Sequence, residues 1–330
     1  MSILRGAKGT WDDVREAQRA HVQSIDLLTR RQHQALDALQ TLSRPRVCEP
    51  VELLGGVLFT APAPGRTVAE EMADRPWDTA ALLDAILLSL TTVHTGDGAR
   101  YLRQAWPLTE RSILDVFRTQ LAGPAAARYI ADLGRDSLIP EGERLDVIAR
   151  VETAVRRLLR LTEAIRPRQR AGVFGDAQPG NIFLSDHRLT FINPALHWAA
   201  GPEPDVAKLI SRTFLLALAQ PSRGDERRIT QGAVAALGRY FQAVPAFERV
   251  ARLREVMVLW VMDTVSTLAT YLSAPAGFPL SDAQMVILSQ ARRVATLTER
   301  VSGLLIGSSS GLDLLETVFH EVEHTVLDLR

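Results

Sequence analysis

The stretch from residue 173 to residue 193 constrains the fold most, because it interrupts an otherwise helical pattern. Three short apolar segments, Val173-Phe174, Ile182 to Leu184 and Leu189 to Ile192, are separated by polar turns. Apolar segments of this length between turn residues are typical of β-strands rather than helices. The sequence therefore predicts a small β-rich insert within a helical body.

The loop that enters this insert reads Gly175-Asp176-Ala177-Gln178-Pro179-Gly180-Asn181. An Asp followed five residues later by an Asn, in a loop between two short strands, directs both side chains into one cleft. Phosphoryl transfer needs a base for the acceptor hydroxyl close to a metal ligand, and kinase-type loops supply them as Asp and Asn. A second metal ligand is expected at the end of the following strand, where Asn193 lies.

The rest of the chain is mainly helical in its periodicity. Between the first two helices, apolar runs flank Gly55-Gly56 and predict a β-hairpin, and the connector Ala61 to Gly65 follows it. Apolar residues recur at helical spacing in Trp11 to Leu42, Asp78 to His94, Ile113 to Leu121, Leu145 to Ile165 and after Pro204.

The Asp176 loop resembles the G-D-x-x-P-x-N catalytic loop of aminoglycoside phosphotransferases and of related choline- and homoserine-kinase-like enzymes. Asp205-Val206-Ala207 is similar to the D-[LV]-A motif that opens a helix in this family. Further likeness lies in Ala61 to Glu70 with Pro64 to Thr67 (the hinge), Leu90 to His94 (a helix ending in histidine) and Arg30 to Leu39 (the N-lobe helix).

The resemblance implies an α+β, protein-kinase-like fold of two lobes. A reduced N-terminal lobe, a helix plus a β-hairpin, is expected at residues 1–60, and a hinge at 61–66. A large, mostly helical C-terminal lobe is expected at 67–330, with the catalytic-loop β insert at 173–193.

The same resemblance implies a role for each matching residue. Asp176 would be the catalytic base, Asn181 and Asn193 would bind magnesium, and Asp205 would brace the loop through backbone hydrogen bonds. Lys8 is the only lysine before the hinge and is the candidate contact for ATP. The implied reaction is ATP- and Mg²⁺-dependent transfer to a hydroxyl. The acceptor would be a small molecule, or Ser/Thr of a precursor peptide in a bacterial peptide-maturation pathway, where a partner protein is conceivable.

Several positions depart from the family pattern and leave a second interpretation open. Asn193 replaces a carboxylate, although a hard cation favours charged oxygen ligands. Phe174 stands where the family has histidine, and Gln32 stands where a glutamate would pair with the ATP-binding lysine. No glycine-rich phosphate-covering loop is visible. The alternative is a catalytically degenerate pseudokinase that serves as a peptide- or partner-binding scaffold.

A competing motif lies near the C-terminus, where His320-Glu321-Val322-Glu323-His324 matches H-E-x-x-H. Histidines four apart share a helix face and could bind zinc with a glutamate as general base. Asp328 is the only candidate third ligand downstream, and the surrounding apolar residues form an ordinary amphipathic stripe. The pattern favours a structural helix over a zinc hydrolase.

Composition excludes several other classes of protein. The formal net charge is zero, which gives no electrostatic reason to expect a nucleic-acid or membrane partner. Cys48 is the only cysteine, so no intramolecular disulfide can form. Residues 1–13 contain no apolar run typical of a secretory signal, and a cytoplasmic location is expected. Of the 38 basic residues only Lys8 and Lys208 are lysines, a bias typical of a GC-rich bacterial genome.

Overall fold

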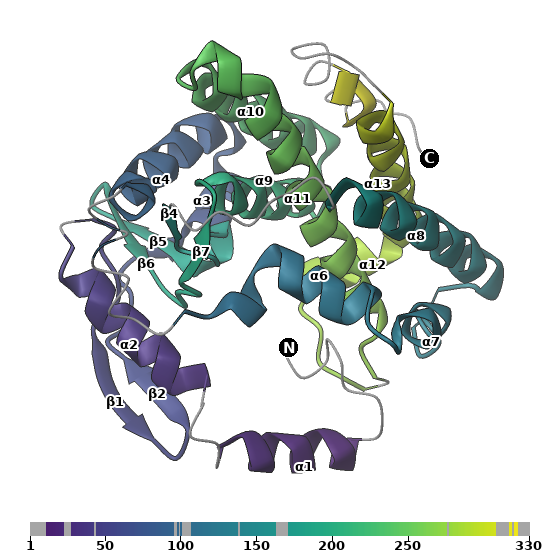
Figure 1. The fold of residues 1–330 in the computed structure, drawn as a ribbon, viewed down its shortest axis with the longest axis horizontal. Coiled ribbons are helices and arrows are strands. Elements are labelled where there is room, and N and C mark those ends of the chain that lie inside the picture. Colours follow the sequence, from purple (N-terminus) through teal and green to yellow (C-terminus); the bar gives the residue numbers. More distant parts are fainter. Residues whose placement is uncertain are drawn as a thin grey trace.

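The fold of the protein is seen in a computed structural model (Figure 1). The structure describes residues 11–22, 28–42, 44–95, 98, 100, 107–137, 139–162, 171–275, 277–307, 317, 318 and 320–322. Helices dominate these residues and the strands are few and short. The predicted fold class, α+β with a large helical lobe, is confirmed.

The N-terminal part consists of α1 (Trp11–Val22), α2 (Leu28–Gln40), β1 (Pro50–Leu54) and β2 (Val57–Thr60). β1 and β2 pair antiparallel around Gly55-Gly56, as predicted. Both glycines have positive φ, 58° and 79°, which a two-residue type I′ turn requires. α2 contacts both strands of this hairpin and buries Leu36 and Leu39.

An ion pair ties α2 to the C-terminal lobe. Arg31 is almost fully buried, and its guanidinium contacts both carboxylate oxygens of Glu110, at 2.6 and 3.0 Å, and the carbonyl oxygen of Pro107. Glu110 belongs to η2 (Thr109–Arg111), a short 3₁₀ turn. The position of α2 is therefore fixed directly to the segment that precedes α6 (Ile113–Leu121).

The β insert forms two small antiparallel sheets. One has the order β3 (Arg66–Thr67), β5 (Ile182–Ser185), β6 (Arg188–Phe191), and the other pairs β4 (Ala171–Val173) with β7 (His197–Ala199). Val47 forms a parallel bridge to Phe191, so the chain that enters the hairpin is attached to the edge of β6. The sequence pattern indicated β5, β6 and the last residue of β4, but it missed β3 and β7.

The remaining helices build the large lobe around α11 (Ala246–Leu272), whose residues from Val256 to Leu272 are all buried. α11 is the one helix of the described residues that is long and apolar enough to cross a membrane. However, 94% of its most apolar window is buried inside the fold, so its side chains form the core. The other elements are α3 (Val68–Asp74), η1 (Pro76–Asp78), α4 (Thr79–His94), α7 (Ala126–Ala131), α8 (Glu141–Thr162), η3 (Pro179–Asn181), α9 (Glu203–Leu218), α10 (Arg223–Gln242), α12 (Asp282–Ser289) and α13 (Ala291–Ile306).

Aromatic contacts fix the β insert and α9 within this core. Phe174 is fully buried and packs edge-to-face on Phe191, with 5.4 Å between ring centroids. Phe214 of α9 packs edge-to-face on Trp260 of α11 at 5.8 Å. Phe174, which replaces a histidine of the family pattern, therefore serves as an apolar anchor at the start of the Asp176 loop.

Candidate active site

A buried carboxylate at the start of α9 holds the entrance of the loop. Asp205 is completely buried, and its two oxygens accept the backbone N–H groups of Phe174 at 2.8 Å and Gly175 at 2.7 Å. The Nε2 atom of His94, at the end of α4, lies 2.9 Å from Asp205 Oδ2. These contacts confirm the bracing role that the family resemblance implies for Asp205, and His94 supports that carboxylate from α4.

Gly175 is required by the shape of this loop. Its φ is +84°, a conformation that side chains disfavour, and a Cβ atom there would lie 2.1 Å from the carbonyl oxygen of Ala195. The segment after β6 packs closely against this loop. The N–H of Ala195 in that segment donates to the carbonyl oxygen of Phe174 at 2.8 Å.

The loop then brings Asp176 and Asn181 together. The amide nitrogen of Asn181 donates to Asp176 Oδ2 at 3.0 Å and contacts the Asp176 backbone oxygen at 3.3 Å. The Ile192 N–H donates to the Asn181 backbone oxygen at 2.9 Å, which fixes η3 against the end of β6. Because the side-chain nitrogen of Asn181 faces Asp176, its side-chain oxygen remains available for a cation.

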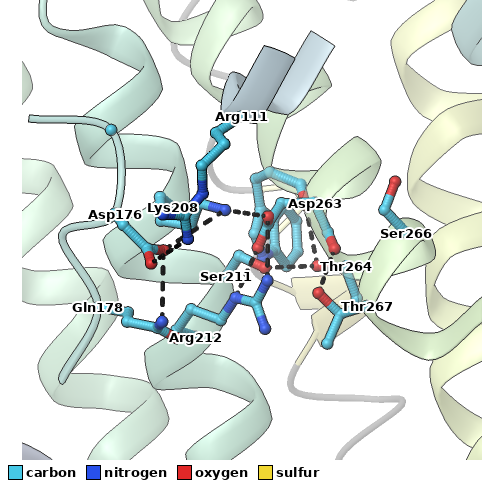
Figure 2. A network of polar contacts seen from close by, with 12 residues as sticks. Arg111, Asp176, Gln178, Lys208, Ser211, Arg212, Asp263, Thr264, Ser266 and Thr267 are labelled. Carbon is cyan, nitrogen blue, oxygen red and sulfur yellow. Dashed lines mark hydrogen bonds and ion pairs between the residues drawn. The ribbon is translucent and has the colours of Figure 1, made fainter. Parts of the chain in front are cut away.

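Two cations that the sequence analysis did not select also reach Asp176 (Figure 2). The Arg111 Nη2 atom lies 3.4 Å from Asp176 Oδ2, and the Lys208 Nζ atom lies 4.0 Å from Oδ1. The Gln178 amide also contacts Oδ1, at 3.3 Å. The carboxylate of Asp176 is thus surrounded by donors on both oxygens.

Lys208 belongs to a buried charge cluster between α9 and α11. Its Nζ atom lies 2.8 Å from Asp263 Oδ1, and Arg212 Nε lies 2.9 Å from Asp263 Oδ2. Burial acts to raise the pKa of Asp263, but the Arg212 and Lys208 charges outweigh it and hold that pKa well below its usual value. Asp263 is therefore ionised and positions both cations. The rarity of lysine in this chain is the sequence signal by which Lys208 could have been selected, although the sequence analysis interpreted it only as a composition bias.

Asn193 lies apart from the side chains that contact Asp176. It follows β6 with φ +54°, a left-handed conformation that asparagine tolerates better than most residues, and its side chain is exposed. It lines a cavity of about 330 Å³ together with Thr29 and Gln32 of α2 and residues of the hairpin. The lining residues carry no charge. Within the described residues, no hydrogen bond joins Asn193 to Asp176 or Asn181.

The other predicted sites receive no structural support. Lys8, His324 and Asp328 lie outside the described residues. His320 is exposed, and Glu321 pairs with Arg300 at 2.6 Å. The part of the chain that the structure describes contains no group of three or more His, Cys, Asp or Glu side chains arranged to hold a metal ion.

A braced Asp–Asn loop between two lobes is the arrangement of the protein-kinase-like fold. Among solved structures, the chain is similar to a thermostable mutant of aminoglycoside phosphotransferase APH(4)-Ia in its apo form. The TM-score is 0.50 at 14% identity, over 86% of this chain and 85% of the other. It is also similar to amicoumacin kinase hAmiN in complex with AMP-PNP, Ca²⁺ and Ami, with TM-score 0.47 at 14% identity, over 83% of this chain and 78% of the other.

No protein-family model matches the sequence, and no curated protein matches it. At 14% identity the structural likeness shows the fold alone. The chain has the protein-kinase-like fold seen in aminoglycoside phosphotransferases, as the sequence resemblance predicted.

Proposed function

We propose that the protein is an ATP- and divalent-metal-dependent phosphotransferase that acts on a hydroxyl group. The observation that carries the proposal is the geometry of Asp176 and Asn181, which lie 3.0 Å apart on a loop braced by a buried aspartate. Burying the Asp205 carboxylate costs free energy, because the charge is desolvated. A protein that bears this cost to fix one loop is expected to use that loop in its function.

In this reaction Asp176 orients the acceptor hydroxyl and takes its proton. The acceptor oxygen forms a bond to the terminal phosphorus of ATP while the bond from that phosphorus to the bridging oxygen breaks, and ADP leaves. Catalysis of this kind depends mainly on positioning and on charge stabilisation. The acceptor is a small molecule or a Ser/Thr side chain of a peptide, and a reduced N-terminal lobe leaves room for either.

The metal site would be built from Asn181 and Asn193. A bound Mg²⁺ would neutralise phosphate charge, and the free side-chain oxygen of Asn181 fits this use. Two neutral amides make a weaker site than one with a carboxylate, since Mg²⁺ is usually bound through carboxylates and substrate phosphates. We therefore expect metal affinity to depend strongly on the bound nucleotide. Lys8 remains a candidate contact for that nucleotide.

Calorimetry with ATP and Mg²⁺ on the wild type and on Asn193→Asp tests this assignment. Aspartate also tolerates a left-handed backbone, so the variant should keep the turn while adding a charged ligand. We expect magnesium-dependent ATP binding by the wild type and tighter binding by the variant. Turnover should fall about 10²- to 10⁴-fold in Asp176→Asn with unchanged thermal unfolding. Unchanged turnover in Asp176→Asn would refute the role of Asp176.

The second candidate function is a non-catalytic scaffold that binds a peptide or a partner protein between the lobes. The neutral Asn193 and the donors already present on both oxygens of Asp176 favour it. ATP binding by neither the wild type nor Asn193→Asp would support the scaffold.

A further inference from the structure

We propose that the acceptor carries an anionic group, a carboxylate or a phosphate, which Arg111 and Lys208 recognise beside Asp176. This inference rests on the proposed phosphotransferase function and names the chemical class of its second substrate. It also gives a role to a charge cluster that catalysis by Asp176 and Asn181 does not by itself require.

The cluster around Asp176 has an excess of positive charge. Among the residues that the structure describes, three cations, Arg111, Lys208 and Arg212, face two carboxylates, Asp176 and Asp263, so the cluster carries one more positive than negative charge. None of the five side chains is more than 22% exposed. In such a site water screens charge poorly, and an excess charge attracts an ion of opposite sign.

Arg111 is the cation best placed to bind that ion. Its contact with Asp176 is 3.4 Å long, whereas charge-assisted contacts are usually about 2.7–2.9 Å. The ion pair between Arg31 and Glu110, by comparison, closes to 2.6 Å. A guanidinium has about five N–H donors in a planar fork that suits a carboxylate or phosphate. Arg111 can therefore exchange its weak contact for a bidentate one.

The approach of the acceptor hydroxyl makes this exchange favourable. To serve as base, Asp176 must accept a hydrogen bond from the hydroxyl, at a carboxylate whose Oδ2 already receives Asn181 and Arg111. The contact of Arg111 with Asp176 is the longer of the two, and it is the one that breaks. An acceptor that displaces Arg111 and also offers it an oxyanion keeps the guanidinium paired throughout.

The cations belong to elements that do not line the cavity beside Asn193, which is the candidate nucleotide cavity of the proposed reaction. That cavity is lined by α2, the hairpin and the residues after β6, and its lining residues are uncharged. Arg111, Lys208 and Asp263 come from η2, α9 and α11 of the large lobe. In Figure 1 hairpin β1–β2 lies below the strands of the β insert, and α9 and α11 lie to the right of those strands. A nucleotide held between the lobes thus leaves the cationic wall, which Arg111 and Lys208 form, to the acceptor. A cationic amino compound would be repelled by these two side chains.

Calorimetric titration of the full chain with inorganic phosphate tests the proposal. It is made on the wild type, on Arg111→Gln and on Arg128→Gln, a control that removes an arginine from the neighbouring α7 whose side chain is 82% exposed. Each titration is repeated with AMP-PNP and Mg²⁺ at saturation, and with methylammonium in place of phosphate. Thermal unfolding of each variant checks that it is folded.

We expect phosphate to bind the wild type and the Arg128 control equally, and Arg111→Gln about tenfold more weakly or worse, because a charge-assisted bidentate contact is lost. Methylammonium should not bind, and phosphate binding should persist with AMP-PNP present. Failure of AMP-PNP to bind would count against the phosphotransferase function, while phosphate binding that depends on Arg111 would still establish the anion site.

Three results would overturn the proposal. The first is no phosphate binding by the wild type. The second is competition between phosphate and AMP-PNP, which would assign the cations to the terminal phosphate of the nucleotide. The third is equal phosphate binding by wild type and Arg111→Gln, which would leave Arg111 only a role in positioning Asp176.

Discussion

Replacing Asp205 with alanine removes three contacts from the buried end of α9 at once. The N–H groups of Phe174 and Gly175 lose their acceptor, and the imidazole of His94 loses its carboxylate. Each buried N–H left without a partner costs about 1–3 kcal/mol. His94 is slightly exposed, so water can replace part of its contact. Together these losses amount to about 3–5 kcal/mol, within the range for breaking a buried charged contact.

Urea unfolding followed by far-UV circular dichroism measures this loss. A matched control is Asp84→Ala, which removes a 41% exposed carboxylate of α4 paired with Arg239, and should cost less than about 1 kcal/mol. Asp205→Asn keeps one acceptor oxygen and should fall between the two. If Asp205→Ala lowered the free energy of unfolding by no more than the Asp84 control, the bracing role derived from these hydrogen bonds would be wrong.

Two further predictions concern the loop and a buried acid. Gly175→Ala should abolish the loop conformation and any transfer activity, because its Cβ would meet the Ala195 oxygen. Gly180→Ala in the same loop has nothing within 4 Å and should be tolerated in both activity and thermal unfolding, and similar losses in the two would contradict the steric reason. Burial, reinforced by the Glu203 carboxylate, raises the pKa of Glu255 to about 7 from an ordinary 4.5. The resulting stabilisation is complete below the ordinary pKa and is lost as pH rises through about 7. Glu255→Gln should therefore reduce the fall in unfolding free energy between about pH 5 and pH 8. An equal fall in the wild type and in Glu255→Gln would refute this assignment to Glu255.

The Asp176 loop was predictable because its characteristic residues lie in one short stretch of sequence. Asp176 and Asn181 are five residues apart, and the turn residues between them determine the local backbone. Asp205 was predictable through its resemblance to a family motif. Its partners Phe174 and Gly175, some thirty residues away, gave no local sign of the contact.

The cationic wall could not be derived in the same way. Arg111, Lys208 and Asp263 belong to three different elements, and only the packing of α9 and of the η2–α6 segment on α11 brings them to one place. An arginine-rich sequence offers no local reason to select Arg111 from its many neighbours. Strands β3 and β7 were missed because two and three residues are too few to show a period.

The ion pair between Arg31 and Glu110 has a consequence for how the two substrates influence each other. Arg31 is adjacent in α2 to Gln32, which lines the candidate nucleotide cavity, and Glu110 is adjacent in η2 to Arg111, which contacts Asp176. A ligand that fixes α2 therefore also fixes Arg111 through a single salt bridge. Thermodynamic linkage makes such coupling reciprocal, so an acceptor that orders Arg111 must raise the affinity for nucleotide by the same factor. We expect the two substrates to bind cooperatively, and Glu110→Gln to reduce that cooperativity.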